Sequence, residues 1–272
     1  MDQLSPQSLP RLVDGVRWSV LVRDAESGEP LGGVDPDAVL RTASVGKVFL
    51  LVEAARAITA GEADPEEPLG WAEEEHVEDS GLWYRLRART LPLADLCVLV
   101  GSVSDNLATN VLVRRFGVAA VARTAATYGV VRSGLLDRVR NERLPGMPWT
   151  LSVGCASELS DVMARLHRDE VVSPAVSAQV RTWLVGNVDL SGVPAGLPLD
   201  PLAHTDADEP PVRLLNKTGS ISVVQADVGV VAGGSGAVAY AALAEWTEDV
   251  TPREEVRAEM RRLGIALGDL VS

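Results

Sequence analysis

The stretch Ser44-Val45-Gly46-Lys47 places a serine and a lysine three residues apart, at the predicted start of a helix over residues 45–60. Residues at positions i and i+3 share one helix face, so the two side chains lie within reach of each other. A serine hydroxyl becomes a useful nucleophile when a nearby base takes its proton, and a lysine made neutral by its surroundings can be that base. The positive end of the helix dipole also favours negative charge developing at Ser44. A Ser-x-x-Lys pair alone is most often ordinary helix surface, so this motif does not decide a function.

The lysine content of the chain points to the same place. Only two of its 25 basic residues are lysines, and the second, Lys217, begins the tripeptide Lys217-Thr218-Gly219. Arginine keeps its proton at all ordinary pH values, whereas the pKa of lysine shifts readily on burial. We infer that these two positions require lysine chemistry.

Two more polar motifs have both a chemical and a purely structural interpretation. Ser104-Asp105-Asn106 lies between two predicted helices, where the serine can relay a proton and the asparagine can bind a lysine and a substrate amide. The same residue types are common helix caps. Lys217-Thr218-Gly219-Ser220 is predicted to end a strand, and Gly219 would let a substrate backbone approach the strand edge. The alternative there is a strand end followed by a turn.

Composition excludes several classes of function. The 272 residues are 46% hydrophobic and 23% charged, which is typical of a soluble globular protein. A net charge of -13 argues against a nucleic-acid or anionic-membrane surface, which would need a basic patch. The longest uncharged run, residues 228–244, contains a Gly-rich turn and is short for a membrane span. It predicts two core strands.

The N-terminus and the cysteines bear on the compartment. Met1 leads into Pro6, Pro10 and Arg11 without an apolar stretch, so we expect no signal peptide and a cytoplasmic location, although a trimmed chain would look the same. Cys97 and Cys155 are too few for a disulfide framework and lack metal-ligand spacing. The three histidines are scattered and predict neither a catalytic triad nor a zinc site; they are His76, His167 and His204.

Hydrophobic periodicity predicts strands at both ends of the chain and helices between them. The expected strands are residues 16–23, a short one near Leu31, 212–216, 222–232 and 237–246. The expected helices are residues 45–60, 91–100 (with Thr90 as its N-cap), 107–116, 118–128, 157–167, 175–184 and 252–267. Residues 62–79 and 189–211 are predicted to be irregular surface. The pattern predicts one α/β domain over residues 1–272, with an antiparallel sheet of about five strands.

Two lobes are expected within this domain. An α/β lobe would comprise residues 1–40 and 207–272, and an all-helical lobe residues 41–206. Ligand clefts favour such lobe interfaces.

Taken together and in this order, the three motifs resemble the Ser-x-x-Lys, Ser-Asp-Asn and Lys-Thr-Gly set of the class A β-lactamases and penicillin-binding proteins. The resemblance covers nearly the whole chain, because the strand before Ser44, the Leu-x-Asp-Leu helix before Ser104 and the strand at residues 227–231 lie where the family has them. It implies a β-lactamase/transpeptidase-like α/β fold.

The resemblance also implies catalytic roles. Ser44 would be the acylated nucleophile and Lys47 its base or proton relay. Ser104, assisted by Lys217, would protonate the leaving nitrogen.

Substrate-binding roles follow in the same way. Asn106 would bind the side-chain amide of the substrate, and Thr218 its carboxylate. The backbone N–H groups of Ser44 and Ser220 would form the oxyanion hole, beside Gly219. Either Trp83 or Tyr84 would be the aromatic residue at the cleft mouth, with core packing as an equal alternative.

The chain departs from the family in one loop. Class A enzymes carry a glutamate that activates the deacylating water, followed shortly by Leu-Asn; here Arg140 stands at that position and no Leu-Asn follows. Glu142 is the nearest carboxylate, and a surface salt bridge with an arginine is its favoured interpretation. Cys97 matches a cysteine that is disulfide-bonded in some members, but Leu51 occupies the partner position, so no disulfide is expected.

We therefore expect a serine hydrolase that forms an acyl-enzyme on Ser44, with a β-lactamase or a related amide hydrolase with weak deacylation as the leading interpretation. A D-alanyl peptidase or esterase of the same fold is one alternative, and a penicillin-binding sensor without turnover is another. The expected substrate is a small β-lactam or a related amide or ester, and antibiotic resistance is the expected context. We expect a monomer with no cofactor, metal, nucleic-acid or membrane partner.

Overall fold

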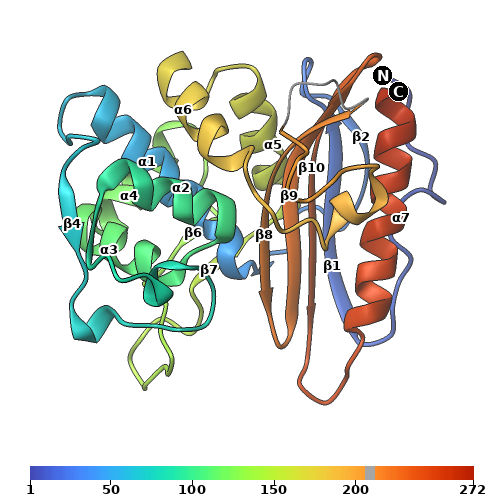
Figure 1. Cartoon of the computed structure of the whole chain (residues 1–272). Helices are drawn as coiled ribbons and strands as arrows, with labels where there is room; N and C mark the ends of the chain where they lie inside the picture. The colour runs from blue at the N-terminus through green and yellow to red at the C-terminus, as the bar shows by residue number, and fades with distance from the viewer. Residues whose placement is uncertain (206–211) are drawn as a thin grey trace.

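Strands from the two ends of the chain pair into one antiparallel sheet, as predicted (Figure 1). The computed structural model describes residues 1–205 and 212–272, and within them the largest sheet has five strands in the order β2-β1-β10-β9-β8. These strands are β1 (Val16–Asp24), β2 (Pro30–Val34), β8 (Val212–Ile221), β9 (Val224–Gly233) and β10 (Gly236–Trp246). The expected α/β class and five-stranded sheet are confirmed.

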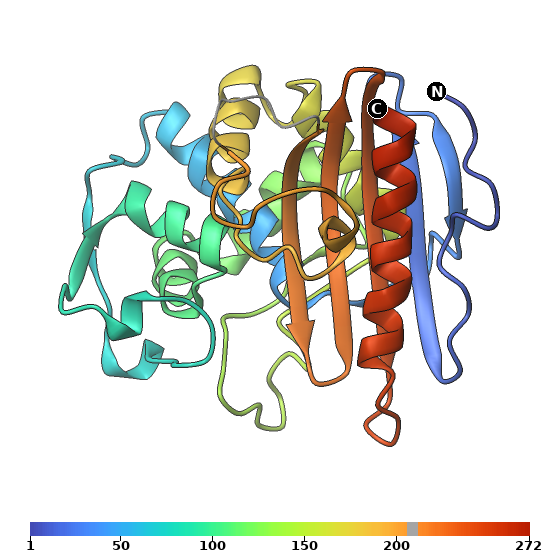
Figure 2. The ribbon, with the colours of Figure 1, turned by 45° about the vertical axis from the view of Figure 1, so that its right-hand side comes forward.

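The long uncharged run forms the middle of the sheet. β9 and β10 are buried along almost their whole length, and strands covered on both faces read as continuous apolar sequence. One face is covered by α7 (Arg253–Val271) and the other by α5 (Ala156–His167), as Figures 1 and 2 show. The tight turn between the strands brings Gly233 against the end of α7, where a β-carbon would come within 2.4 Å of the Val271 carbonyl oxygen.

The helices on the other side of the molecule surround α1 (Lys47–Thr59). This helix is buried around almost its entire circumference, as expected of a helix packed on all sides. Its neighbours are α2 (Leu93–Val103), α3 (Asn106–Phe116), α4 (Val118–Thr127) and α6 (Pro174–Leu184). The predicted lobe boundary at residues 206 and 207 lies outside the described residues, so the division into lobes stays a prediction.

Three short strands hold the beginning of α1 in place. β3 (Leu40–Arg41) and β6 (Gly134–Leu135) both pair with β7 (Ser152–Gly154). The 3-10 turn η1 (Ala43–Gly46) follows β3 and leads into α1. Ser44 therefore lies in a 3-10 turn, and the α-helix begins at Lys47 rather than at Val45.

Two predicted boundaries are wrong because strand pairing overrides the local signal. Thr90 is not a helix cap: residues Thr90–Pro92 form β5, which pairs with β4 (Pro68–Gly70), so α2 begins at Leu93. β8 does not end near Asn216 either. It continues to Ile221, with Lys217 opposite Val228 and Gly219 opposite Ala226 of β9.

The predicted irregular segments have short ordered pieces. The acidic stretch contains β4 and the 3-10 turn η2 (Glu73–Glu75), and a further turn, η3 (Trp83–Arg85), follows it. The second segment contains η4 (Val193–Gly196), which packs on α7, and its last residues, 206–211, lie outside the described part. None of the helices in residues 1–205 and 212–272 has the length and apolar character needed to cross a membrane.

Candidate active site

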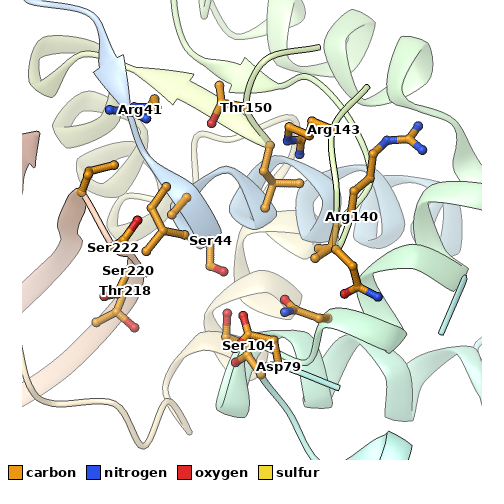
Figure 3. A pocket seen from close by; sticks show the side chains of 18 of the residues that line it. Arg41, Ser44, Asp79, Ser104, Arg140, Arg143, Thr150, Thr218, Ser220 and Ser222 are labelled. Carbon is orange, nitrogen blue, oxygen red and sulfur yellow. The ribbon is translucent and has the colours of Figure 1, made fainter. Parts of the chain in front are cut away.

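A cleft of about 590 Å³ lies between β8, the turn η1 and the loop that joins β6 to β7. Figure 3 shows Ser44 in its centre, with Thr218, Ser220 and Ser222 on one side, Arg140 and Arg143 on the other, and Ser104 beside Asp79. Its lining residues are Arg41, Ala43, Ser44, Asp79, Ser80, Ser104, Asn106, Val139, Arg140, Asn141, Glu142, Arg143, Trp149, Thr150, Leu151, Asp189, Thr218, Ser220, Ile221, Ser222, Val223 and Glu248.

Two glycines allow the turn that carries Ser44 to pack tightly. A β-carbon at Gly219 would lie 2.2 Å from the Thr42 carbonyl oxygen and 2.8 Å from the Ser44 backbone nitrogen. A β-carbon at Gly46 would lie 2.3 Å from that of Ser152. Gly219 was expected to admit a substrate backbone; the structure supplies another reason for glycine, because β8 lies directly against the backbone of η1.

Lys47 is completely buried, and its amine is held by the segment that follows α2. Its Nζ donates to the Ser104 carbonyl oxygen at 2.6 Å and to Asn106 Oδ1 at 2.7 Å, and it lies 3.3 Å from Ser104 Oγ. Burial, reinforced by the charge of Lys217, holds the pKa of Lys47 well below its ordinary value, although Asp105 and Asp79 oppose the shift. The neutral amine is thereby favoured.

Lys217 reaches the same serine from β8. Its buried Nζ donates to Ser104 Oγ at 3.0 Å and to the Thr218 carbonyl oxygen at 2.9 Å. Burial lowers the pKa of Lys217 to about 8, while the negative charges of Asp189 and Asp227 limit the fall. The Ser104 hydroxyl therefore lies between two buried amines.

Asp105 fixes the backbone that presents Ser104 and Asn106. Its buried carboxylate caps α3 by accepting from the Ala108 N–H at 2.8 Å, and it also accepts from Leu82 and Trp83 N–H groups at 2.7 and 2.8 Å. Ser104 has φ +55°, in the left-handed region that costs a serine energy. Both interpretations of the Ser104-Asp105-Asn106 motif therefore apply. Asp105 is a helix cap, whereas Ser104 and Asn106 contact the lysines.

Ser220 has a partner that sequence reasoning missed. Arg253, at the start of α7, donates to Ser220 Oγ at 2.8 Å and to the carbonyl oxygen of Ile221 at 2.6 Å. Its guanidinium also lies over the ring of Trp246. An arginine 33 residues from the motif carries no local signal, so only the fold reveals this contact.

Behind β8, a buried network surrounds Asp227. Its carboxylate accepts from Tyr240 Oη at 3.0 Å, Asn216 Nδ2 at 3.1 Å and the Val193 N–H at 3.0 Å. Burial raises the pKa of Asp227 to about 8 against the effect of these hydrogen bonds. The sequence placed Asp227 only in a strand, with no hint of this role.

The loop wall opposite β8 is organised around Asp137. Arg140 Nε and Arg143 Nη1 bind one oxygen of this carboxylate at 2.7 and 2.6 Å. Burial would raise the pKa of Asp137, but the two arginines outweigh burial and lower it. Arg140, which stands where a glutamate was expected, is therefore committed to an ion pair within the loop.

The three residues assigned with least support have mixed outcomes. Glu142 lines the cleft, and within the described chain no arginine pairs with it, because Arg143 binds Asp137 instead. Trp83 is fully buried and donates through Nε1 to the Ala88 carbonyl oxygen, so it is a core residue. Tyr84 does not line the cleft either. The exposed aromatic ring of the cleft lining is Trp149, which faces the guanidinium of Arg41.

The comparisons with known proteins agree with this geometry. A family model described as the β-lactamase enzyme family matches residues 8–271. The protein is accordingly a serine hydrolase of the β-lactamase-like class, which acts on cyclic amide bonds. The chain belongs to the β-lactamase enzyme family. Among curated proteins, none matches it by sequence.

Solved structures share the fold across almost the whole chain. A β-lactamase from Sphaerobacter thermophilus is 23% identical with a TM-score of 0.80, and the match covers 95% of this chain and 94% of that one. PBP-A is 20% identical with a TM-score of 0.77, covering 94% and 90%. A variant of the class A β-lactamase of the last common ancestor of Gram-negative bacteria is 25% identical with a TM-score of 0.74, covering 93% and 94%. The predicted fold is confirmed.

Proposed function

We propose that the protein cleaves a β-lactam or a related amide through an acyl-enzyme on Ser44, and that it deacylates slowly. The observation that carries this proposal is the position of the Ser104 hydroxyl between the amines of Lys47 and Lys217, at 3.3 and 3.0 Å. Two buried lysines on one hydroxyl form a path along which a proton can move.

The hydrogen bonds of Lys47 suit it to act as the base. A neutral amine has two N–H donors and one lone pair, and two carbonyl oxygens, of Ser104 and Asn106, accept from Lys47. The lone pair is left for a hydroxyl proton. In the proposed acylation Lys47 takes the proton of Ser44 Oγ as this oxygen bonds to the carbonyl carbon of the lactam.

Completing the step requires a proton on the leaving nitrogen. As the C–N bond breaks, the Ser104 hydroxyl gives its proton to that nitrogen and regains one from Lys47, so the proton taken from Ser44 ends on the product. Lys217 keeps the Ser104 oxygen in position and supplies positive potential. The backbone N–H groups of Ser44 and Ser220 are proposed to stabilise the oxyanion.

Slow deacylation is proposed because the loop wall holds no positioned base. Hydrolysis of the acyl-enzyme needs a water molecule and a group that takes its proton. Arg140 is paired with Asp137, and Glu142 is exposed at the cleft edge. This observation also supports the second candidate, a penicillin-binding module without turnover.

Intact mass spectrometry after incubation with benzylpenicillin tests the proposal. We expect an adduct of the mass of the penicillin that forms and then decays slowly. An adduct that never decays would favour the non-turnover module. Absence of any adduct, together with labelling by an activated ester or a D-alanyl peptide, would favour the peptidase or esterase. Membership of class A, a part in antibiotic resistance, a monomeric state and a cytoplasmic location stay predictions from the sequence.

A further inference from the structure

The arginines that line the cleft all form ion pairs with carboxylates of the protein itself. Arg140 and Arg143 both bind Asp137, and Arg41 binds Glu245. A guanidinium engaged in such a pair is poorly available to an anionic substrate.

Among residues 1–205 and 212–272, the carboxylates of the same cleft have no such partners. Four acidic residues line it, and within the described chain no lysine, arginine or histidine forms an ion pair with any of them; they are Asp79, Glu142, Asp189 and Glu248. In the described residues no three acidic, histidine or cysteine side chains converge to hold a metal ion. These four carboxylates are therefore not held in ion pairs within the described chain, although the charge of Lys217 acts on Asp189 from β8.

Among these four residues, Asp189 is held in place by a network of hydrogen bonds. Asn187 is buried, and its Nδ2 donates to Asn216 Oδ1 at 2.8 Å and to the Asp189 carbonyl oxygen at 3.3 Å. The Ser191 N–H donates to Asp189 Oδ1 at 3.1 Å, and the Val188 N–H ties the segment to the Ser102 carbonyl oxygen at 3.0 Å. The carboxylate is thus fixed relative to β8.

Asp189 is also charged and close to the Thr218 side chain. Burial would raise its pKa, but hydrogen bonds from Ser191 and from the Thr218 side chain, with the charge of Lys217, lower it. Thr218 is the residue for which a substrate carboxylate was expected. Thr218 and the Asp189 carboxylate line the same cleft.

We propose that Asp189 makes the Thr218 end of the cleft select substrates with a positively charged group there and discriminate against substrates with a carboxylate. The proposal rests on the acyl-enzyme function proposed above and names its substrate class: amides or cyclic amides that carry an ammonium beside the scissile bond. A second anion next to Asp189 meets like charge in a partly desolvated place, where repulsion exceeds that in water. An ammonium there gains an ion pair.

A matched series of three β-lactams tests the selectivity. The series comprises benzylpenicillin, its neutral methyl ester and its 2-(dimethylamino)ethyl ester, which is cationic at neutral pH. The rate of adduct formation on Ser44 is measured by intact mass at equal concentrations. We expect the cationic ester to acylate fastest and benzylpenicillin slowest, with a spread of roughly ten- to a hundredfold, the range expected for one partly solvated charge contact.

Substitution of Asp189 by asparagine provides the decisive comparison. Asp189→Asn keeps the shape of the side chain and removes its charge. Benzylpenicillin should therefore acylate Ser44 faster than in the wild type, and the cationic ester more slowly. If this charge is the source of the selectivity, the ratio of the two acylation rates should shrink to about threefold or less. Glu248→Gln removes another carboxylate of the cleft, and Glu255→Gln removes one outside it; both should leave the order unchanged. Because Asp189 is half-buried, the preference should persist in 0.5 M salt, which screens the exposed carboxylates.

The outcomes separate this inference from the proposed function. If all three compounds label Ser44 but benzylpenicillin is fastest, or if Asp189→Asn leaves their order unchanged, the selectivity is wrong and the acyl-enzyme stands. If Glu248→Gln shifts the order as much as Asp189→Asn does, general cleft charge is responsible and the role of Asp189 is wrong. If none of the three labels Ser44, the proposed function itself fails. Circular dichroism of Asp189→Asn distinguishes lost folding from lost selectivity.

Discussion

Two parts of the cleft use charged side chains in opposite ways. We call Ser44, Ser104 and the buried lysines Lys47 and Lys217 the floor, and the loop that contains Asp137, Arg140 and Arg143 the wall. On the floor, Lys47 and Lys217 are fully buried, and neither has a carboxylate within ion-pair distance among the described residues. In the wall, the charged side chains pair with one another within the loop, where Arg140 and Arg143 share Asp137. The lysines of the floor contact the Ser104 hydroxyl, whereas the arginines of the wall form ion pairs that stabilise the loop.

This difference separates the two halves of the proposed reaction. Acylation needs only a nucleophile, a base and a proton path, and the floor contains residues suited to each. Deacylation needs a base beside a water molecule, and the loop wall is where the family resemblance places that base. A protein with this floor and this wall should acylate readily and release its product slowly.

The largest effect expected in this comparison comes from the nucleophile. Ser44→Ala should abolish covalent labelling by a β-lactam or a fluorophosphonate, because no other hydroxyl is positioned in η1 to replace it. The measurement is intact mass, with Tm as the control for folding, since a half-buried serine in a turn should tolerate alanine. Labelling that persists in Ser44→Ala would place the nucleophile elsewhere.

The two lysines should respond differently to the same change. Lys47→Arg keeps the charge but removes the accessible neutral form, so acylation should fall by roughly 10²–10⁴, the usual contribution of general base catalysis. Lys217→Arg should cost less, because the proposed role of Lys217 is electrostatic. Stopped-flow acylation rates of both variants measure the difference. Equal tolerance of the two substitutions would show that neither lysine is a base.

The pH dependence of acylation should reveal both amines. The rate should rise with pH as Lys47, whose pKa is lowered, loses its proton and becomes a base. It should fall again above about pH 8, as Lys217 loses the charge that its pKa of about 8 maintains. The charges of Asp189 and Asp227 act on Lys217. The fall in rate at alkaline pH therefore reports the titration of these three interacting groups together.

A variant assigns that alkaline limb. In Lys217→Arg the guanidinium stays protonated, and the fall above about pH 8 should disappear while the rise at lower pH remains. The uncatalysed hydrolysis of the β-lactam is subtracted at each pH. Persistence of the alkaline fall in Lys217→Arg would assign it to another group.

Much of the fold was predictable because its signals are local. Residues 228–244 lack charge and contain one Gly-rich interruption, which describes two buried strands and their turn. The helix around Lys47 has apolar residues on every face. By contrast, Thr90 resembles a helix cap, and only the pairing of β5 with β4 shows that it lies in a strand.

The site was predictable where its residues form short motifs and not where long-range packing creates the contact. Ser44, Lys47, Ser104, Asn106 and Lys217 were singled out by spacing, and the structure brings their segments together. Asp189 lies in a segment that read as a surface connection, and Arg253 begins a distant helix. Asp189 lines the cleft and Arg253 contacts Ser220, which lines it, only because the fold brings these distant segments to β8.

The smallest expected effect concerns Glu142 and sharpens the contrast between floor and wall. Glu142 lines the cleft but is exposed, and none of the described residues holds its carboxylate by a hydrogen bond. A base without fixed geometry contributes little, so Glu142→Gln should change the deacylation rate by less than roughly tenfold, below the usual range for a positioned base. The measurement is the decay of the benzylpenicillin adduct, with Glu255→Gln as a matched control on α7.

A trapped adduct in Glu142→Gln, with acylation still fast, would show that Glu142 activates the water. In that case the wall takes part in the chemistry, and wild-type turnover could reach or exceed the roughly 10 s⁻¹ typical of enzymes.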